Sequence, residues 1–140
     1  MRRIKGYYFI TDAGLSRQGN ENDVKEAESA GAALIQYRNK DVPTPQFFKE
    51  ALILRQLCKK SLFIVNDRID VAYGVHADGV HIGQSDGSLQ QARKILGPKK
   101  IIGVTVHSLS QALQAQKRGA SYIALAPIFA TGTKHDAGLP

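Results

Sequence analysis

The stretch Leu62-Phe63-Ile64-Val65-Asn66-Asp67-Arg68 decides the fold, because a short apolar run with β-branched members stops abruptly at an amide, a carboxylate and a guanidinium. Such a run is typical of a strand that is buried on both faces of a sheet. The same order, with apolar residues first and polar or turn-forming residues last, recurs in the segments 9–12, 34–38, 80–84, 104–107 and 125–127. Strands that bring their carboxyl ends to one rim would form a site there.

Helix signals separate the first three of these strands. Asn22 is predicted to cap a helix that ends at Gly31, and Thr44 with Pro45 to provide the cap and the first-turn proline of a second helix. The second helix has apolar residues that recur at three- and four-residue spacing, which is the period of a helix: Phe47, Phe48, Ala51, Leu52, Leu54, Leu57 and Cys58.

Three further helices are predicted after the central strand. Residues 69–73 form a short one, and Ser88 with Gln91, like Ser108 with Gln111, has the spacing of a capping box. The two helices that these boxes open are expected to bury Leu89, Ala92 and Leu96, and Leu109, Ala112 and Leu113.

Alternating strands and helices predict a parallel sheet with right-handed crossovers, either an open doubly wound sheet or a (β/α)8 barrel. Polar residues at the end of nearly every strand favour the barrel, and no Gly-x-Gly-x-x-Gly follows the first strand. We therefore expect an α/β protein of the (β/α)8 TIM-barrel type, as a single partial domain over 1–140. It would be incomplete, with about six of the eight strands of such a barrel and with strands seven and eight absent.

Composition bounds the possible partners and the compartment. The 140 residues are 43% hydrophobic and 22% charged, and neither a signal-peptide core nor an apolar run long enough to span a bilayer is present. We expect a cytoplasmic protein with no membrane partner, in which the lone Cys58 is a buried small hydrophobe. The net charge of +7 suits anionic ligands, but the cations are spread over the helices rather than interleaved with aromatic residues, which argues against nucleic acid.

Gln36, Arg38 and Lys40 alternate at a period of two, so an extended segment projects all three from one side. A guanidinium fork beside an ammonium suits a polyanionic phosphate. Two solvated cations at the end of a strand are the plain alternative.

Asp67 and Asp86 follow strands that adjoin in a barrel. Two carboxylates about 4 Å apart repel by about 4 kcal/mol at a surface-like dielectric, so a facing pair favours a cation between them. Their hard oxygen atoms suit Mg²⁺ together with substrate phosphates. Alternatively, Asp67 caps the helix at 69–73 and Asp86 with Gly87 forms an ordinary turn.

The segment Thr131-Gly132-Thr133-Lys134 is a hydroxyl-bearing loop closed by a lysine, without the spacing of a P-loop. It could hold a phosphate or be a flexible polar loop. His81 and His107 lie in or just after strands, where a structural histidine is the usual outcome, and no His/Cys spacing indicates zinc.

Motifs in register along the chain closely resemble the thiamine phosphate synthase family, which is related to the thiazole tautomerases. They are Gln36-x-Arg38-x-Lys40, Asn66-Asp67-Arg68, His81-Ile82-Gly83-Gln84-x-Asp86, Gly103-Val104-Thr105-x-His107 and Pro127-Ile128-Phe129-x-Thr131-x-Thr133-Lys134. The resemblance implies a transferase that joins hydroxymethylpyrimidine diphosphate to thiazole phosphate, forms thiamine phosphate and releases pyrophosphate.

The resemblance also implies a role for each matched residue. Arg38, Lys40 and Lys134 would act on the departing diphosphate, and Mg²⁺ would be the cofactor, held by Asp67 and Asp86. The substrates would be bound by Gln36 against the pyrimidine, by Asn66 and Thr105 at the diphosphate, and by Thr131 and Thr133 at the thiazole phosphate. Thr105 stands where the family usually has serine, which keeps the hydroxyl, and Gly132 where proline is common.

Two other functions are kept open. Val106-His107-Ser108 is similar to the thiazole tautomerases, although the presence of both Asp67 and Asp86 favours the synthase. A non-catalytic phosphate-binding or interaction protein is the other alternative. We also expect that missing strands would impair turnover by the isolated chain and leave open sheet edges, which suit self-association or a complementing chain.

Overall fold

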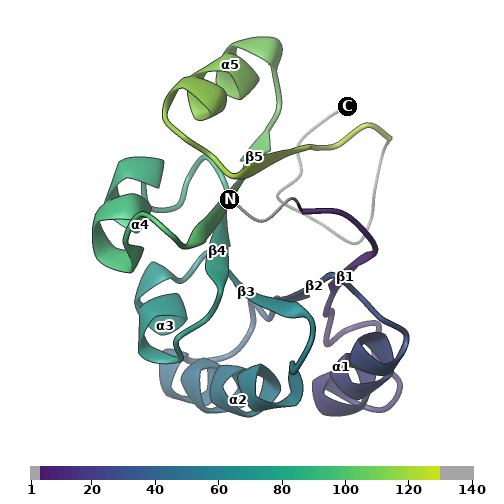
Figure 1. Cartoon of the computed structure of the whole chain (residues 1–140). Helices are drawn as coiled ribbons and strands as arrows, with labels where there is room; N and C mark the ends of the chain where they lie inside the picture. The colour runs from purple at the N-terminus through teal and green to yellow at the C-terminus, as the bar shows by residue number, and fades with distance from the viewer. Residues whose placement is uncertain (1–3, 130–140) are drawn as a thin grey trace.

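The computed structural model describes residues 4–129 (Figure 1). Within this range six strands form one parallel sheet: β1 (Tyr8–Ile10), β2 (Leu34–Tyr37), β3 (Leu62–Asn66), β4 (Gly79–Ile82), β5 (Ile101–Val106) and β6 (Tyr122–Leu125). The helices between them are α1 (Asn20–Ser29), α2 (Thr44–Leu57), α3 (Ile69–Gly74), α4 (Leu89–Leu96) and α5 (Leu109–Lys117). None of these helices has the length and apolar character needed to cross a bilayer.

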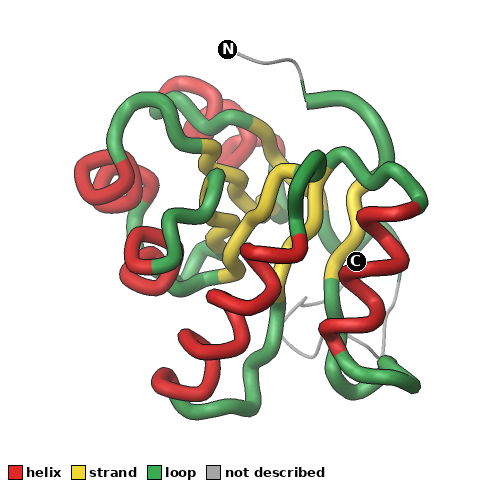
Figure 2. The backbone as a smooth tube through the Cα atoms, turned by 60° about the horizontal axis from the view of Figure 1, so that its bottom comes forward, coloured by secondary structure: helices red, strands yellow, loops and turns green. Residues whose placement is uncertain are grey.

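The order of the strands distinguishes a barrel from a doubly wound sheet, the two architectures that the sequence allows. Each strand pairs in parallel with the next one along the chain, from β1 to β6, and the order never reverses. The strands follow an arc with the helices along its outer side (Figure 1), and Figure 2 shows the strands in the middle of the molecule with helices around them. A doubly wound sheet has a switch point and helices on both faces, so the structure is a half-barrel of the TIM type.

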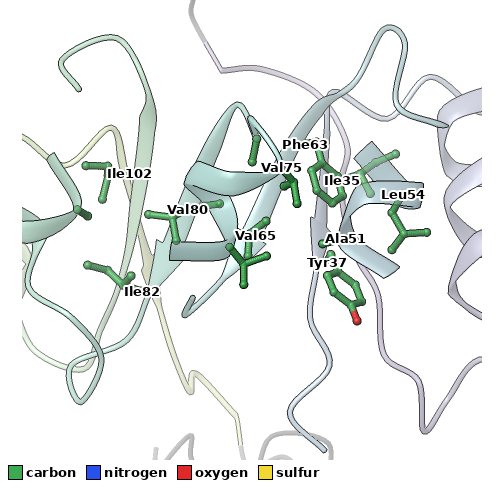
Figure 3. Close-up of a cluster of buried hydrophobic side chains, with 14 of the residues drawn as sticks. Ile35, Tyr37, Ala51, Leu54, Phe63, Val65, Val75, Val80, Ile82 and Ile102 are labelled. Atoms are coloured by element: carbon green, nitrogen blue, oxygen red, sulfur yellow. The ribbon is translucent and has the colours of Figure 1, made fainter. Parts of the chain in front are cut away.

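The core lies between the sheet and its helices (Figure 3). Alternate strand residues face outward, and Ile35, Phe63 and Val80 are completely buried there against helix residues such as Leu54. Cys58 joins this cluster, and burial raises the pKa of its thiol to about 12. The predicted role of a buried small hydrophobe is confirmed, because such a thiol stays protonated and unreactive.

Two helix starts differ from the prediction. Helix α1 begins at Asn20 after Gly19, two residues before the expected cap Asn22, and Thr44 is the first residue of α2 rather than its cap. Neither helix start has a side-chain cap, because Gly19 and Pro43 occupy the N-cap positions. Short polar residues are common near such loops, so composition alone does not fix the helix start.

Of the two predicted capping boxes, one is complete and the other is partial. Ser88 and Gln91 exchange both hydrogen bonds of the box. Ser108 accepts from the backbone of Gln111, but the side chain of Gln111 accepts from His107 instead of closing the box. Both serines nevertheless start their helices as predicted.

The prediction that α5 buries its leucines is wrong within the described part of the chain. Leu109 and Leu113 are 76% and 56% exposed, and Ala115 is the buried residue of α5. Ile123 and Leu125 of β6 are exposed on the same side. In a barrel a helix also packs against the unit that follows it, and the described residues provide no such unit beyond α5 and β6.

The carboxylate of Glu28 connects the end of α1 to the residues just before β3 by hydrogen bonds. It accepts hydrogen bonds from the backbone of Lys59 at 3.0 Å, of Lys60 at 2.6 Å and of Ser61 at 3.1 Å. Partial burial raises the pKa of Glu28, but hydrogen bonds from Ser61, Lys60 and Lys59 outweigh it, so the net pKa lies below the usual value. The ionised form is therefore favoured in the folded protein.

We expect Glu28→Gln to lower the melting temperature by a few degrees at pH 7. Because the folded pKa is depressed, the carboxylate stabilises the fold above the unfolded pKa, and this contribution is lost as the pH falls through the folded pKa. The two melting curves should therefore converge in acid. Glu26→Gln, on the exposed face of the same helix, is the control. A difference between Glu28→Gln and the native chain that stays constant with pH would contradict the assignment.

Candidate functional site

The carboxyl ends of the strands enclose a pocket of about 140 Å³. Five of the residues predicted from the sequence line it, and the structure thus brings them together from four loops and strands: Lys40, Asn66, Asp67, Asp86 and Thr105. The remaining lining residues are His81, Gly83, Gln84, Ser85 and His107. The site lies where chemistry is assembled in a barrel, at the carboxyl rim of the sheet.

Asp67 follows directly after β3 in a left-handed conformation, with φ 62°. Non-glycine residues rarely adopt this conformation, and such strain is concentrated at functional sites. Its backbone N–H donates to the carbonyl of His81 at 2.7 Å, which fixes the turn. The predicted alternative, that Asp67 caps α3, is wrong, because Arg68 occupies the N-cap position without a side-chain bond.

Asp86 lines the same pocket and also closes its own loop. Its Oδ2 accepts the backbone N–H of Gly83 at 2.6 Å. The turn expected for Asp86 and Gly87 and the position in the pocket are therefore compatible. A carboxylate oriented by a backbone donor is already ordered before any ligand arrives.

The two cations of the strand-two motif occupy different places. Lys40 Nζ lies 3.8 Å from Oδ2 of Asp67, in the pocket. Arg38 Nη1 lies 3.4 Å from Oδ2 of Asp12, after the neighbouring strand β1, and Arg38 does not line this pocket. The structure therefore places Lys40 with the carboxylates and Arg38 on the side of β1.

Gln36 lies deeper, inside the half-barrel, where it is 3% exposed. Its Nε2 donates to Tyr8 Oη at 2.7 Å, and Tyr8 in turn contacts Tyr122 of β6. Burial raises the pKa of Tyr8 more than its hydrogen bonds with Tyr122 and Gln36 lower it, and burial likewise raises the pKa of Tyr122. Both phenols are therefore neutral hydroxyl groups.

Sequence reasoning missed the tyrosines and underrated His81. His81 has both ring nitrogens in hydrogen bonds, Nδ1 to Tyr122 Oη at 2.9 Å and Nε2 to Thr105 Oγ1 at 2.8 Å. The expectation of a satisfied structural histidine is confirmed, but the ring also borders the pocket. The sequence did contain a sign of this arrangement. Polar side chains such as Gln36 and His81 stand within otherwise apolar strands, at positions that face the inside of the half-barrel.

His107 lies at the rim of the pocket after β5. Its Nδ1 lies 2.5 Å from the carbonyl oxygen of Ala126, and its backbone donates to Gln111. The ring is thus held between β5 and the segment after β6.

The donor set of the pocket fits Mg²⁺. Among residues 4–129 no group of three or more His, Cys, Asp or Glu side chains could form a metal site made by protein alone. Mg²⁺ commonly uses only one or two carboxylates and completes its coordination with water and substrate phosphates. Asp67 and Asp86 provide two such carboxylates, and Asn66 and Thr105 lie beside them in the pocket.

Three predicted residues, Thr131, Thr133 and Lys134, lie outside the described residues. Their roles stay predictions.

Comparison with known proteins gives consistent results. The family described as "Thiamine monophosphate synthase" matches residues 7–140. A thiamine-phosphate synthase of Methanosarcina mazei is 50% identical over 133 residues, which are 94% of this chain and 55% of that protein. A thiamine-phosphate synthase of Chloroflexus aurantiacus is 50% identical over 136 residues, 95% of this chain and 62% of that protein.

A solved structure agrees with the fold. The thiamine phosphate pyrophosphorylase from Pyrococcus furiosus superposes with a TM-score of 0.82 at 41% identity, over 91% of this chain and 62% of that one. This chain therefore spans somewhat over half of the length of the relatives that it matches.

Proposed function

The chain belongs to the thiamine monophosphate synthase family, and from that membership we propose that its pocket binds the diphosphate of hydroxymethylpyrimidine diphosphate together with Mg²⁺. The reaction would join this substrate to thiazole phosphate, forming thiamine phosphate and releasing pyrophosphate. The observation that carries the proposal is that Asp67, Asp86 and Lys40 line one pocket, with Lys40 Nζ 3.8 Å from Oδ2 of Asp67. Two carboxylates and a cation in one small pocket suit a metal-bound polyanion better than any neutral ligand.

The chain's own residues suit a reaction whose main requirement is a stabilised leaving group. When bound between Asp67 and Asp86, Mg²⁺ would supply positive charge to the diphosphate oxygens. Lys40 adds a cation from the neighbouring loop, and Asn66 and Thr105 add neutral hydrogen-bond donors. Such groups stabilise charge that develops as pyrophosphate departs, so no nucleophilic side chain is needed.

Arg38 belongs to the same proposal from the side of β1. Its ion pair with Asp12 is 3.4 Å long, which is a weak contact that a phosphate can replace. The interior amide of Gln36 would lie against the pyrimidine ring. Thr131, Thr133 and Lys134 would bind the thiazole phosphate and the diphosphate.

The closed (β/α)8 barrel is proposed as the working form. Both edges of the half-barrel carry uncovered apolar residues among those described, such as Tyr7 beside β1 and Leu125 in β6. A groove of about 630 Å³ also runs along β1 and α1. Further βα units, a complementing chain or a second copy would cover these surfaces.

Calorimetric titration with pyrophosphate tests the proposed function. We expect binding to be at least tenfold tighter with Mg²⁺ than without it, a change equivalent to about 1.4 kcal/mol. Binding that falls steeply with salt but is indifferent to Mg²⁺ would instead indicate a non-catalytic anion-binding surface.

A thiazole tautomerase-like function is the second candidate, because His107 lines the pocket and its ring is held by Ala126. A histidine fixed in this way could move protons between ring positions of a substrate. Under this alternative, activity toward a thiazole phosphate depends on His107 and is insensitive to chelation of Mg²⁺ by EDTA.

A further inference from the structure

A row of hydrogen bonds crosses the inside of the half-barrel and ends at the pocket. Gln36 Nε2 donates to Tyr8 Oη at 2.7 Å, and Tyr8 Oη lies 2.6 Å from Tyr122 Oη. Tyr122 Oη lies 2.9 Å from His81 Nδ1, and His81 Nε2 lies 2.8 Å from Thr105 Oγ1. The row therefore links β2, β1, β6, β4 and β5, and its last member borders the site.

Gln36, the first member of the row, determines which group donates and which accepts in each of its hydrogen bonds. An amide nitrogen donates and cannot accept, so the oxygen of Tyr8 accepts from Gln36 and its own O–H is available for Tyr122. Within the described residues Tyr8 Oη has hydrogen bonds with Gln36 and Tyr122, so its O–H has an acceptor only in Tyr122. Tyr122 therefore accepts from Tyr8 and donates its own O–H to Nδ1 of His81. A neutral imidazole with an accepting Nδ1 carries its proton on Nε2, which donates to Thr105.

The hydroxyl group of Thr105, at the end of the row, is then a hydrogen-bond donor to the pocket. Because Thr105 Oγ1 accepts from His81, its single O–H is left to donate elsewhere, and Thr105 lines the pocket with Lys40. A hydroxyl that donates suits an anionic oxygen, whereas one that presents lone pairs repels it.

We propose that Gln36 is a positioning residue that sets the direction of this row, so that His81 is the Nε2–H tautomer and Thr105 donates its hydroxyl proton to a phosphate oxygen in the pocket. The inference rests on the proposed function only for the identity of the anion. Gln36, His81 and Thr105 act here through hydrogen-bond direction and not through a change of charge.

Burial and packing keep the row from reversing. Gln36 is 3% exposed, His81 7% and Thr105 3%, so bulk water does not compete for the hydrogen bond between His81 and Thr105. The rings of His81 and Tyr122 are stacked with centroids 5.5 Å apart, and Tyr8 meets Tyr122 edge to face at 5.8 Å. Tyr8 and Tyr122 both have a raised pKa, so they stay hydroxyl donors.

Nitrogen NMR of the histidine rings tests the direction in the ligand-free chain. The chain has four histidines, and a His81→Phe variant identifies the signals of His81. We expect a protonated Nε2 and an unprotonated Nδ1. A proton on Nδ1, or on both nitrogens, overturns the proposal.

Gln36→Glu reverses the first step, because an ionised carboxylate accepts and cannot donate. With the carboxylate shown to be ionised by its carbon NMR shift, Tyr8 would donate to it and the proton of His81 would move to Nδ1. The matched control is Gln90→Glu, an exposed residue of α4 that adds the same charge elsewhere. An unchanged His81 tautomer in Gln36→Glu overturns the role of Gln36.

Pyrophosphate titration in the presence of Mg²⁺ measures the consequence. We expect Thr105→Val to weaken binding by about tenfold or more, the value of a hydrogen bond to a charged group. Gln36→Glu should weaken binding by a similar factor in the native background and by much less in the Thr105→Val background. An equal loss in both backgrounds would mean simple repulsion by the new charge and would overturn the proposal.

The two proposals fail in different ways. Absence of pyrophosphate binding by the native chain contradicts the proposed function, while the tautomer of His81 and its reversal in Gln36→Glu still decide the direction of the row. Mg²⁺-dependent binding with His81 protonated on Nδ1 leaves the proposed function standing and overturns the role of Gln36.

Discussion

The double replacement of Asp67→Asn and Asp86→Asn is expected to abolish the Mg²⁺-dependent part of pyrophosphate binding, weakening it by about a hundredfold or more. Two charged ligands are lost, each worth about 1.5–3 kcal/mol. Asparagine is the informative choice at both positions. It tolerates the left-handed backbone of residue 67, and at residue 86 its oxygen can still accept the N–H of Gly83. The loss therefore reports the charge and not a disrupted loop.

Calorimetric titration with and without Mg²⁺ measures this effect, and Asp70→Asn is the control. Asp70 is an exposed carboxylate in the first turn of α3, close in sequence to Asp67 but outside the pocket. Equal affinities for the double variant and the Asp70→Asn variant would refute the metal role of the pair.

Gly103→Ala is expected to destabilise the fold by about 1–3 kcal/mol, the usual cost of overpacking an interior. A Cβ at this position would collide with the ring and hydroxyl of Tyr122 and with Nδ1 of His81, which lies 2.6 Å away. Movement of either ring alone would stretch the 2.9 Å hydrogen bond between them. Because Gly103 in β5 has no side chain, it leaves the space in which the two rings stack.

Urea unfolding measures the loss as a lower midpoint with an unchanged slope. Gly14→Ala is the control, because its Cβ would meet only Oδ1 of Asp12, at an ordinary 3.4 Å. If the two alanine variants unfold at the same urea concentration, the packing at Gly103 is not as tight as the contacts indicate.

The sequence predicted the strands and their rim well because those features depend on local chemistry. A short apolar run that ends in polar residues has few alternatives to a buried strand, so β3 and its terminal Asn66 and Asp67 were predictable. The juxtaposition of Asp67, Asp86 and Lys40 followed from the parallel order of the strands.

Features that depend on distant contacts could not be predicted in the same way. The helical pattern of Leu109 and Leu113 states only that α5 has an apolar face, while exposure depends on what packs against that face. Arg38 turns toward Asp12 because β1 adjoins β2, a partner 26 residues away in sequence. The tyrosine contact between Tyr8 and Tyr122 joins the two edge strands across 114 residues, and no local pattern encodes it.

The strictly sequential strand order has a consequence for how the chain is made. Because each strand pairs with the one synthesised just before it, a growing chain can add one βα unit at a time to the edge of the strands that have already formed. Such short-range pairing lowers the loop-closure entropy that must be overcome before the sheet gains stability. The arc can thus gain order as successive strands emerge from the ribosome, and the contact of Tyr8 with Tyr122 forms only after β6 has emerged.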